Sequence, residues 1–104
     1  MDRKHHPIIS NPHEYDISFF SFSIDEVSQD SIIELQLQKE NEVVRLKFTG
    51  VRDLSIEKGF PNPTRGLFIE DVSSFQMEAI NIYVGDAEVT QGSIVFWAKA
   101  VEKL

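Results

Sequence analysis

Apolar and polar residues alternate along four separate stretches of this chain. In each stretch every second side chain is large and apolar, and those between are mostly polar or charged. The apolar positions are Phe20, Phe22 and Ile24; Ile33, Leu35 and Leu37; Val44, Leu46 and Phe48; and Ile80, Ile82 and Val84. Because successive side chains of a strand point to opposite faces, this period of two predicts β-strands with one buried face. Strands of a parallel sheet have continuous apolar runs instead, so we expect an antiparallel arrangement.

Turn residues separate the alternating stretches and complete the predicted fold. Gly50 interrupts one apolar pattern, which resumes at Leu54 and Ile56. A glycine inside a strand pattern often marks a bulge or sharp bend, so we expect a corner there that lets one strand serve two sheets. The chain is predicted to be all-β: a single antiparallel β-sandwich or partly open β-barrel of about six to eight short strands.

The first fifteen residues lack this alternation. They contain all three histidines and two of the four prolines, with Ile8, Ile9 and Tyr15 as their main apolar residues. Such a mixture cannot build a core, so we expect residues 1–15 to form a flexible or loosely docked N-terminal arm with these three anchors. Residues 16–104 then form one antiparallel β domain.

The segment Ile17–Ile24 contains no charged residue and has high β-propensity. A strand of this composition, left at an exposed sheet edge, would pair with other chains and aggregate. We therefore expect this segment to be paired with neighbouring strands and covered by the rest of the domain.

Length and composition exclude several kinds of protein. The chain has 104 residues, which suits one small domain, and it has no cysteine. Disulfide frameworks, cysteine nucleophiles and thiolate metal sites are therefore excluded. The N-terminus lacks the apolar run of a signal peptide, and no apolar stretch approaches the roughly 20 residues of a membrane span. We expect a soluble, cytoplasmic protein that does not contact membranes.

The charge balance points to a protein partner. With 10 basic and 17 acidic residues, the formal net charge is −7, which argues against nucleic-acid binding and favours a basic protein. Arg45, Lys47 and Arg52 alternate in what reads as one strand and form a candidate basic stripe that pairs with Glu34 on a neighbouring strand. The candidate acidic surface consists of Glu70, Asp71, Asp86 and Glu88.

Residue types capable of catalysis are present but poorly placed. His5, His6 and His13 could ligate zinc, but all three lie in the predicted arm, so we expect neither a metal site nor a cofactor. No Gly-x-Ser-x-Gly or phosphate-binding loop occurs. Carboxylate pairs at turns leave open a small enzyme or a ligand-binding protein with acidic groups at a barrel mouth. No catalytic residue is predicted, and a non-enzymatic protein is favoured.

Three apolar residues are candidate partner contacts. If Ile94, Phe96 and Ala98 face the core, then Val95 and Trp97 face outward. Trp97 is then either covered by the arm or a second sheet, or part of a contact patch for a partner or a second copy of the chain. Phe60, within a proline-containing loop, is either a plug over the barrel end or an exposed anchor.

Part of the sequence resembles small bacterial all-β proteins, some of which are grouped with the immunity proteins of polymorphic toxin systems. The resemblance rests on five segments: LKFTGVRDLSI at 46–56, LFIEDV at 67–72, QME at 76–78, INIYV at 80–84 and IVFWA at 94–98. It implies an all-β fold and an inhibitor that binds a protein toxin, and it assigns no functional residue.

These observations favour a non-enzymatic, acidic protein-binding module, with a bacterial immunity-type inhibitor as its most specific form. Two alternatives stay open. The first is a small-ligand-binding protein or small enzyme that uses carboxylates at a barrel mouth. The second is a self-associating structural domain, with an oligomer formed through the last strand around Trp97.

Overall fold

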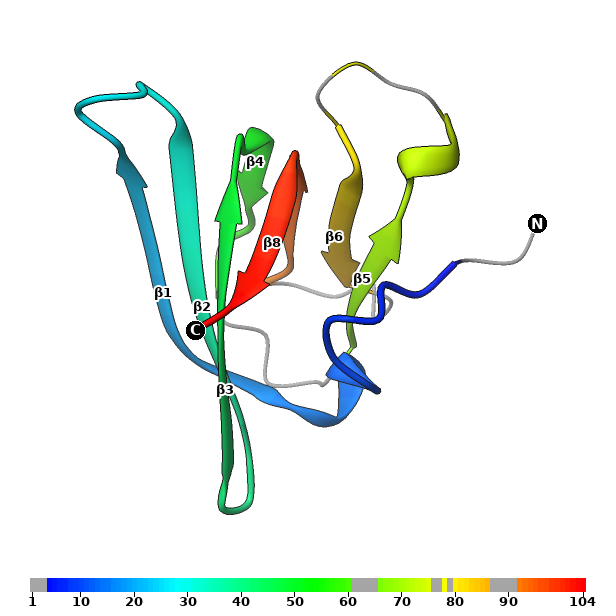
Figure 1. Ribbon diagram of the computed structural model, residues 1–104. Helices are drawn as coiled ribbons and strands as arrows, with labels where there is room; N and C mark the ends of the chain where they lie inside the picture. The colour runs from blue at the N-terminus through cyan, green and yellow to red at the C-terminus, as the bar shows by residue number, and fades with distance from the viewer. Residues whose placement is uncertain (1–3, 61–65, 76–77, 79, 87–91) are drawn as a thin grey trace.

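The computed structural model contains two four-stranded antiparallel sheets, as the alternating pattern predicts (Figure 1). It describes residues 4–60, 66–75, 78, 80–86 and 92–104. The first sheet has the order β1 (Asp16–Ile24), β2 (Ser31–Lys39), β3 (Glu42–Thr49), β8 (Ala100–Lys103), and the second β4 (Arg52–Ile56), β7 (Ile94–Ala98), β6 (Ile82–Asp86), β5 (Leu67–Asp71). Two single turns of 3-10 helix, η1 (Pro12–Glu14) and η2 (Ser73–Phe75), complete the elements of the described residues. The predicted all-β sandwich is confirmed.

The core lies between the two sheets and is built by the alternating residues. In β2 the side chains of Ile33, Leu35 and Leu37 are fully buried, while the residues between them are not. Across the core, the rings of Phe48 from β3 and Phe96 from β7 meet edge to face with centroids 5.0 Å apart. Each such side chain contributes about 1.5–3 kcal/mol by leaving water, which is why the alternation determines the fold.

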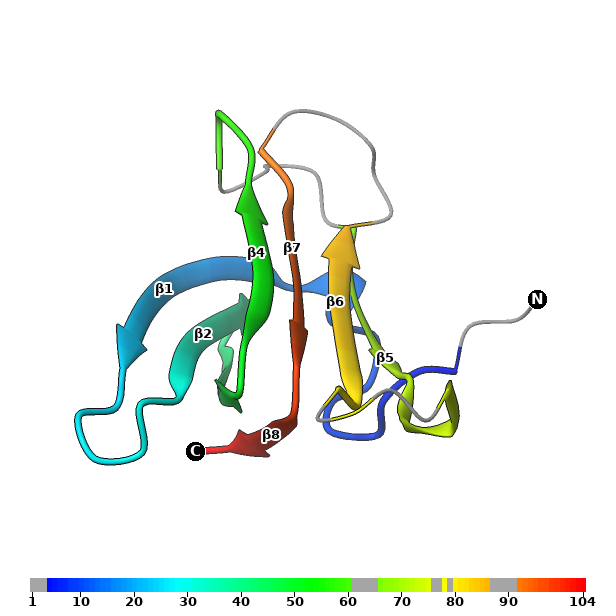
Figure 2. The ribbon, with the colours of Figure 1, turned by 90° about the horizontal axis from the view of Figure 1, so that it is seen from above.

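A bent pair of strands joins the two sheets. β3 continues into β4 through Gly50, and β7 continues into β8 through Lys99, and each of these connections passes from one sheet to the other. Thr49 is paired with Ala100 on one side of the bend, and Arg52 is paired with Trp97 on the other. Gly50 has φ 64°, a left-handed conformation that suits glycine. The predicted corner at Gly50 is confirmed, and Figure 2 shows how it turns β4 across the direction of β1 and β2.

Residues 4–15, the described part of the predicted arm, are docked in the structure and are called the N-terminal segment. The backbone N–H of His6 donates to Ile69 O at 2.9 Å, and the N–H of Asp71 donates to Lys4 O at 2.8 Å, so the segment adds to the free edge of β5. Of the predicted anchors, Ile9 and Tyr15 are buried in the core, and Ile8 packs partly against it. The segment thus runs from β5 to the start of β1 and connects the edges of the two sheets (Figure 1).

Two polar contacts tie the same segment to the β2–β3 hairpin. The Tyr15 hydroxyl donates to a Glu42 carboxylate oxygen, and Lys39 Nζ donates to Glu14 Oε1. The hydrogen bond to Glu42 raises the pKa of the Tyr15 hydroxyl, since the neutral phenol is the donor. These contacts hold the start of β1 against the turn between β2 and β3.

The expectation that Ile17–Ile24 is covered is wrong, although the segment is paired. β1 pairs with β2 along its length, and it is the outermost strand of its sheet among the described residues. Phe19, Phe22 and Ile24 are 42%, 45% and 56% exposed. Phe22 and Ile24 are on the inner face, but the crossed arrangement of the sheets takes the end of β1 past β4, where no strand faces it (Figure 2). Phe19 is exposed because it lies opposite Gln36, on the outer face.

Candidate protein-binding face

The outer surface of the β4–β7–β6–β5 sheet carries a row of opposed side chains. Glu70 is paired with Tyr83, Tyr83 with Trp97, and Trp97 with Arg52, so one row crosses all four strands. Directly opposed residues of antiparallel strands lie on the same face. Because Ile82, Val84, Phe96 and Ala98 point into the core, Tyr83 and Trp97 point away from it. We call the surface formed by Arg52, Phe68, Glu70, Tyr83, Val95 and Trp97 the aromatic face.

Three rings contact one another along the aromatic face. The centroids of Tyr83 and Trp97 lie 4.4 Å apart with the rings tilted by 45°, and those of Phe68 and Tyr83 lie 5.8 Å apart. Trp97 and Tyr83 are half-buried, while Phe68 is only 8% exposed and forms the base of the row. Mutual packing holds Trp97 and Tyr83 in place, so they present apolar area at low entropic cost.

Gly85 makes room for the base of this row. Phe68 is paired with Gly85, and a Cβ built on Gly85 would lie 2.7 Å from Phe68 Cζ. The absence of a side chain at Gly85 thus leaves room for the end of the Phe68 ring, which also contacts Tyr83. Val95, two residues before Trp97 on β7, is half-buried on the same face.

The three predicted contact residues do not lie together. Val95 and Trp97 share the aromatic face, and Trp97 does not lie between the two sheets, nor does the described part of the N-terminal segment cover it, since that segment pairs with the far edge of β5. Phe60 instead packs edge to face against Phe20, with centroids 5.6 Å apart, at the margin of the core. Phe60 therefore packs against the core and lies apart from the aromatic face.

The predicted acidic residues are dispersed. Glu70 belongs to the aromatic face, whereas Asp71 and Asp86 lie at opposite ends of the β5–β6 ladder, and Glu88 is outside the described residues. The Ser73 hydroxyl and backbone N–H donate to Asp71 Oδ1 at 2.6 and 3.0 Å and lower the pKa of that carboxyl. Lys4 Nζ lies 3.7 Å from its other oxygen. Asp71 thus stabilises local structure, and the structure does not bring the three described acidic residues, Glu70, Asp71 and Asp86, into one surface.

The predicted basic stripe is split between the sheets. Arg45 and Lys47 lie on β3 opposite Gln36 and Glu34, so the expected opposition of Lys47 and Glu34 is present in the register. Arg52 lies on β4 in the other sheet, because the corner at Gly50 separates it from β3. The expectation of one continuous stripe is wrong, and Arg52 contributes instead to the aromatic face.

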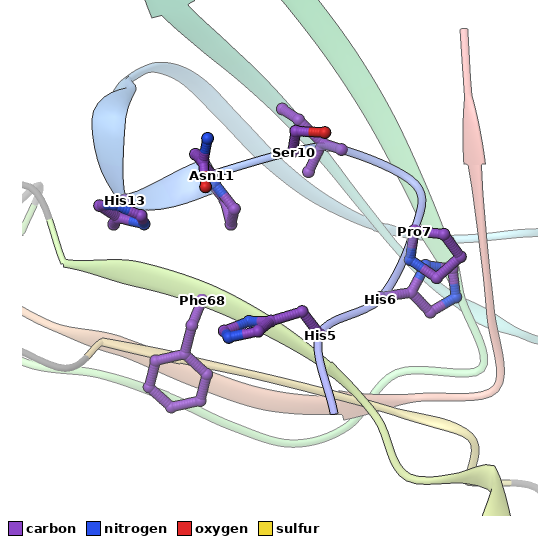
Figure 3. Close-up of a pocket in the computed structure, with 9 residues that line it drawn as sticks. His5, His6, Pro7, Ser10, Asn11, His13 and Phe68 are labelled. Carbon is purple, nitrogen blue, oxygen red and sulfur yellow. The ribbon is translucent and has the colours of Figure 1, made fainter. Parts of the chain in front are cut away.

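A cavity of about 310 Å³ lies between the N-terminal segment and β5, with His5, His6, His13 and Phe68 in its lining (Figure 3). His5 lies beside Phe68, while His6 lies next to Pro7 at the other end. His6 Nδ1 accepts a hydrogen bond from the Ile8 N–H at 3.0 Å. Burial lowers the pKa of His6, and the Asp71 carboxylate opposes part of this effect. The lining contains no Asp or Glu, so it does not provide the paired carboxylates considered for an enzyme.

A second hollow, at the β2–β3 turn, does contain two carboxylates. It is lined by the four consecutive residues Lys39, Glu40, Asn41 and Glu42. Glu42 already accepts the hydroxyl hydrogen of Tyr15, and Lys39 is bound to Glu14. These residues are thus engaged in attaching the N-terminal segment to the hairpin.

The described residues contain no group of three or more histidine, aspartate or glutamate side chains placed to hold a metal ion. A helix with the length and apolarity to cross a membrane is also absent from the part of the chain that the structure describes. Comparison with protein-family models, with curated proteins and with solved structures finds no match to this chain.

Proposed function

We propose that this chain is a non-enzymatic, acidic protein-binding module and that the aromatic face holds its partner. The observation that supports this most strongly is the row of contacting rings of Phe68, Tyr83 and Trp97 on an outer sheet face. Tryptophan, tyrosine and arginine are the residues that most often dominate the binding energy of protein interfaces. Here Trp97 and Tyr83 stand beside Arg52 in one row.

The charge of the chain favours a basic partner bound in one orientation. The formal net charge of −7 attracts a basic partner over distances near the Debye length of about 8–10 Å. Within the aromatic face, Arg52 and Glu70 lie at the two ends of the row, where charged groups favour one orientation of the partner. The most specific form of the proposal is a cytoplasmic immunity-type inhibitor that binds a basic bacterial toxin.

Site-specific photo-crosslinking in the native host tests the proposal. A photoreactive amino acid at Val95 is expected to form an adduct with one protein, while the same amino acid at Val43, on an outer face of the other sheet, forms none. Val43 is a matched control because it is a valine in a strand and is 51% exposed. Equal adducts at both positions, or none at Val95, would contradict the proposal.

The inhibitor form is tested by co-expression. If the product of the neighbouring gene arrests growth, this chain should restore growth. Trp97→Ala should weaken the complex at least about 30-fold, which corresponds to about 2 kcal/mol of binding free energy. Val43→Ala should restore growth like the unaltered chain. Restoration by Trp97→Ala at the lowest protein level at which Val43→Ala still restores growth would exclude the aromatic face as the toxin contact.

A second candidate function is binding of a small ligand in the 310 Å³ cavity. The imidazoles of His5 and His13, with the ring of Phe68, would suit a small molecule that has an acidic group and an apolar body. Addition of small aromatic carboxylic acids would then shift the NMR signals of the His5 and His13 imidazoles. Unchanged signals at millimolar ligand would count against this second candidate.

A further inference from the structure

The outer edge of β1 carries an exposed and uncharged run of residues. Among the described residues, β1 has a strand neighbour only in β2, and its side chains Phe19, Phe22 and Ile24 are 42–56% exposed. Natural edge strands are usually protected by lysine, proline or a bulge. The irregularity in β1 lies at its start, between Ile17 and Phe19, and the six residues that follow are regular, uncharged and free of proline.

We propose that β1 pairs antiparallel with β1 of a second copy of this chain, about a two-fold axis at Phe22. The two β1–β2–β3–β8 sheets would then form one continuous sheet. The same patch serves both copies, as a two-fold interface requires. Addition of a strand at a free edge satisfies backbone N–H and C=O groups, and opposed side chains determine the register.

The sequence of β1 is self-complementary in this register. Phe22 lies opposite Phe22 of the second copy, Phe20 opposite Ile24, and Ser21 opposite Ser23. Apolar side chains therefore meet on the inner face, and serines meet on the outer face, as the pairing of Phe20, Phe22 and Ile24 with β2 assigns those faces.

Neighbouring registers are less favourable. An axis at Ser21 would place Ile24 opposite the irregularity at Ser18. An axis at Phe20 would place Phe22 opposite Ser18, at the irregularity, so the inner-face Phe22 would lose its apolar partner. A shift by one residue would join the apolar face of one copy to the serine face of the other.

Local charges at the ends of the proposed ladder suit a second copy as the occupant of this edge. In the proposed register, Asp25 at the end of β1 lies opposite Phe19 of the other copy. The guanidinium carbon of Arg45 lies 5.3 Å from the centre of that Phe19 ring. Asp25 would therefore approach Arg45 of the other copy once at each end of the ladder, and no like charges would be opposed within it. The hydrogen bond that Asp25 Oδ1 accepts from the Val27 N–H at 2.9 Å favours the ionised carboxylate.

This interface and the aromatic face lie on different sheets. Self-association through β1 is thus compatible with partner binding, and failure of either proposal leaves the other intact. The interface also differs from an oligomer formed through the last strand, since β8 pairs with β3 rather than with β1.

Sedimentation velocity tests the proposal on the full chain. The unaltered protein should form a dimer whose fraction rises with concentration. Phe22→Lys places two like charges at the axis and should weaken the dimer more than about tenfold. Val27→Lys adds the same charge at a turn residue that is 94% exposed, and it should leave the dimer unchanged.

Cysteine crosslinking tests the register without depending on dimer strength. The chain has no cysteine, so Phe22→Cys introduces a single thiol at the axis, where opposed Cα atoms lie about 4.5–5.5 Å apart and allow a disulfide. Phe22→Cys should form a disulfide-linked dimer much faster than Val27→Cys. A protein that is monomeric up to about 1 mM, or equal crosslinking of the two variants, would overturn the proposal.

Discussion

Gly50 and Lys99 pack against each other at the bend that joins the two sheets. A Cβ on Gly50 would lie 2.7 Å from Lys99 Cβ, and the Lys99 N–H donates to Thr49 O at 2.9 Å. The two corners of the bent strand pair therefore fit only because one of these residues has no side chain. The positions of β4 and β7 relative to β3 and β8, and hence the aromatic face, depend on this contact.

Gly50→Ala should destabilise the fold strongly. The alanine must adopt φ 64°, which costs about 1–2 kcal/mol, and its Cβ clashes with Lys99 Cβ. Urea unfolding measures the loss. In a Lys99→Gly background the clash is relieved, so the same substitution should cost only the conformational part. Equal costs in the two backgrounds would show that the contact between the corners is unimportant.

Phe96→Ala should lower the free energy of unfolding by about 3–5 kcal/mol, because it leaves a cavity in the centre of the core. Phe96 is fully buried and meets Phe48 edge to face. Phe75→Ala is the matched control, since Phe75 is 56% exposed and should change stability by less than about 0.5 kcal/mol. Comparable losses for the two variants in urea unfolding would contradict the described core.

Acidification should loosen the N-terminal segment. The folded state lowers the pKa of His6 below its ordinary value of 6.5, so the unfolded chain binds the proton first and stability falls as pH drops below 6.5. His6→Asn keeps an acceptor for the Ile8 N–H but does not titrate. In this variant the melting temperature should therefore depend less on pH just below pH 6.5.

Asp71 provides the contrast in the same experiment. Its folded-state pKa lies below the ordinary value of 3.8, so its contribution persists above that value and disappears as pH falls further. Both His6→Asn and the unaltered chain should lose stability in this lower range. If the melting temperature of His6→Asn fell with pH as steeply as that of the unaltered chain just below pH 6.5, His6 would not couple protonation to folding.

Tyr83→Ala should shift the fluorescence emission of Trp97 to longer wavelength. Trp97 is the single tryptophan of the chain, and its ring centroid lies 4.4 Å from that of Tyr83, so loss of the tyrosine exposes the indole to water. Phe75→Ala should leave the emission maximum unchanged. An unchanged spectrum in Tyr83→Ala would contradict the contact between the Tyr83 and Trp97 rings.

The alternating pattern predicted the strands and their buried side chains because it is a local property that each strand shows by itself. The predicted corner at Gly50 follows from a local signal of the same kind. The positions of sheet edges depend on how strands are ordered in space, which no local pattern contains, so the exposure of β1 was predicted wrongly. At the β2–β3 turn the residue with the left-handed backbone is Glu40, with φ 53°, although the neighbouring Asn41 is of a type that tolerates this conformation better.

The candidate site was predictable only in part. Alternation in the last strands placed Val95 and Trp97 on an outer face, and the structure agrees. Tyr83 and Phe68 were missed as their companions, although the alternation of 80–84 already placed Tyr83 opposite the apolar residues. Their assembly with Trp97 requires the pairing of β5, β6 and β7, a long-range property. Phe60 was grouped with Val95 and Trp97, but it packs against Phe20, a contact between distant parts of the chain that no local pattern predicts.

Calorimetric titration of the chain with the protein crosslinked at Val95 tests the central claim most directly. The unaltered chain and Val43→Ala should bind with the same affinity, whereas Trp97→Ala should bind at least about 30-fold more weakly, and Tyr83→Ala should also weaken the complex. Full affinity in Trp97→Ala and Tyr83→Ala, with both variants folded, would show that the aromatic face is not where the partner binds.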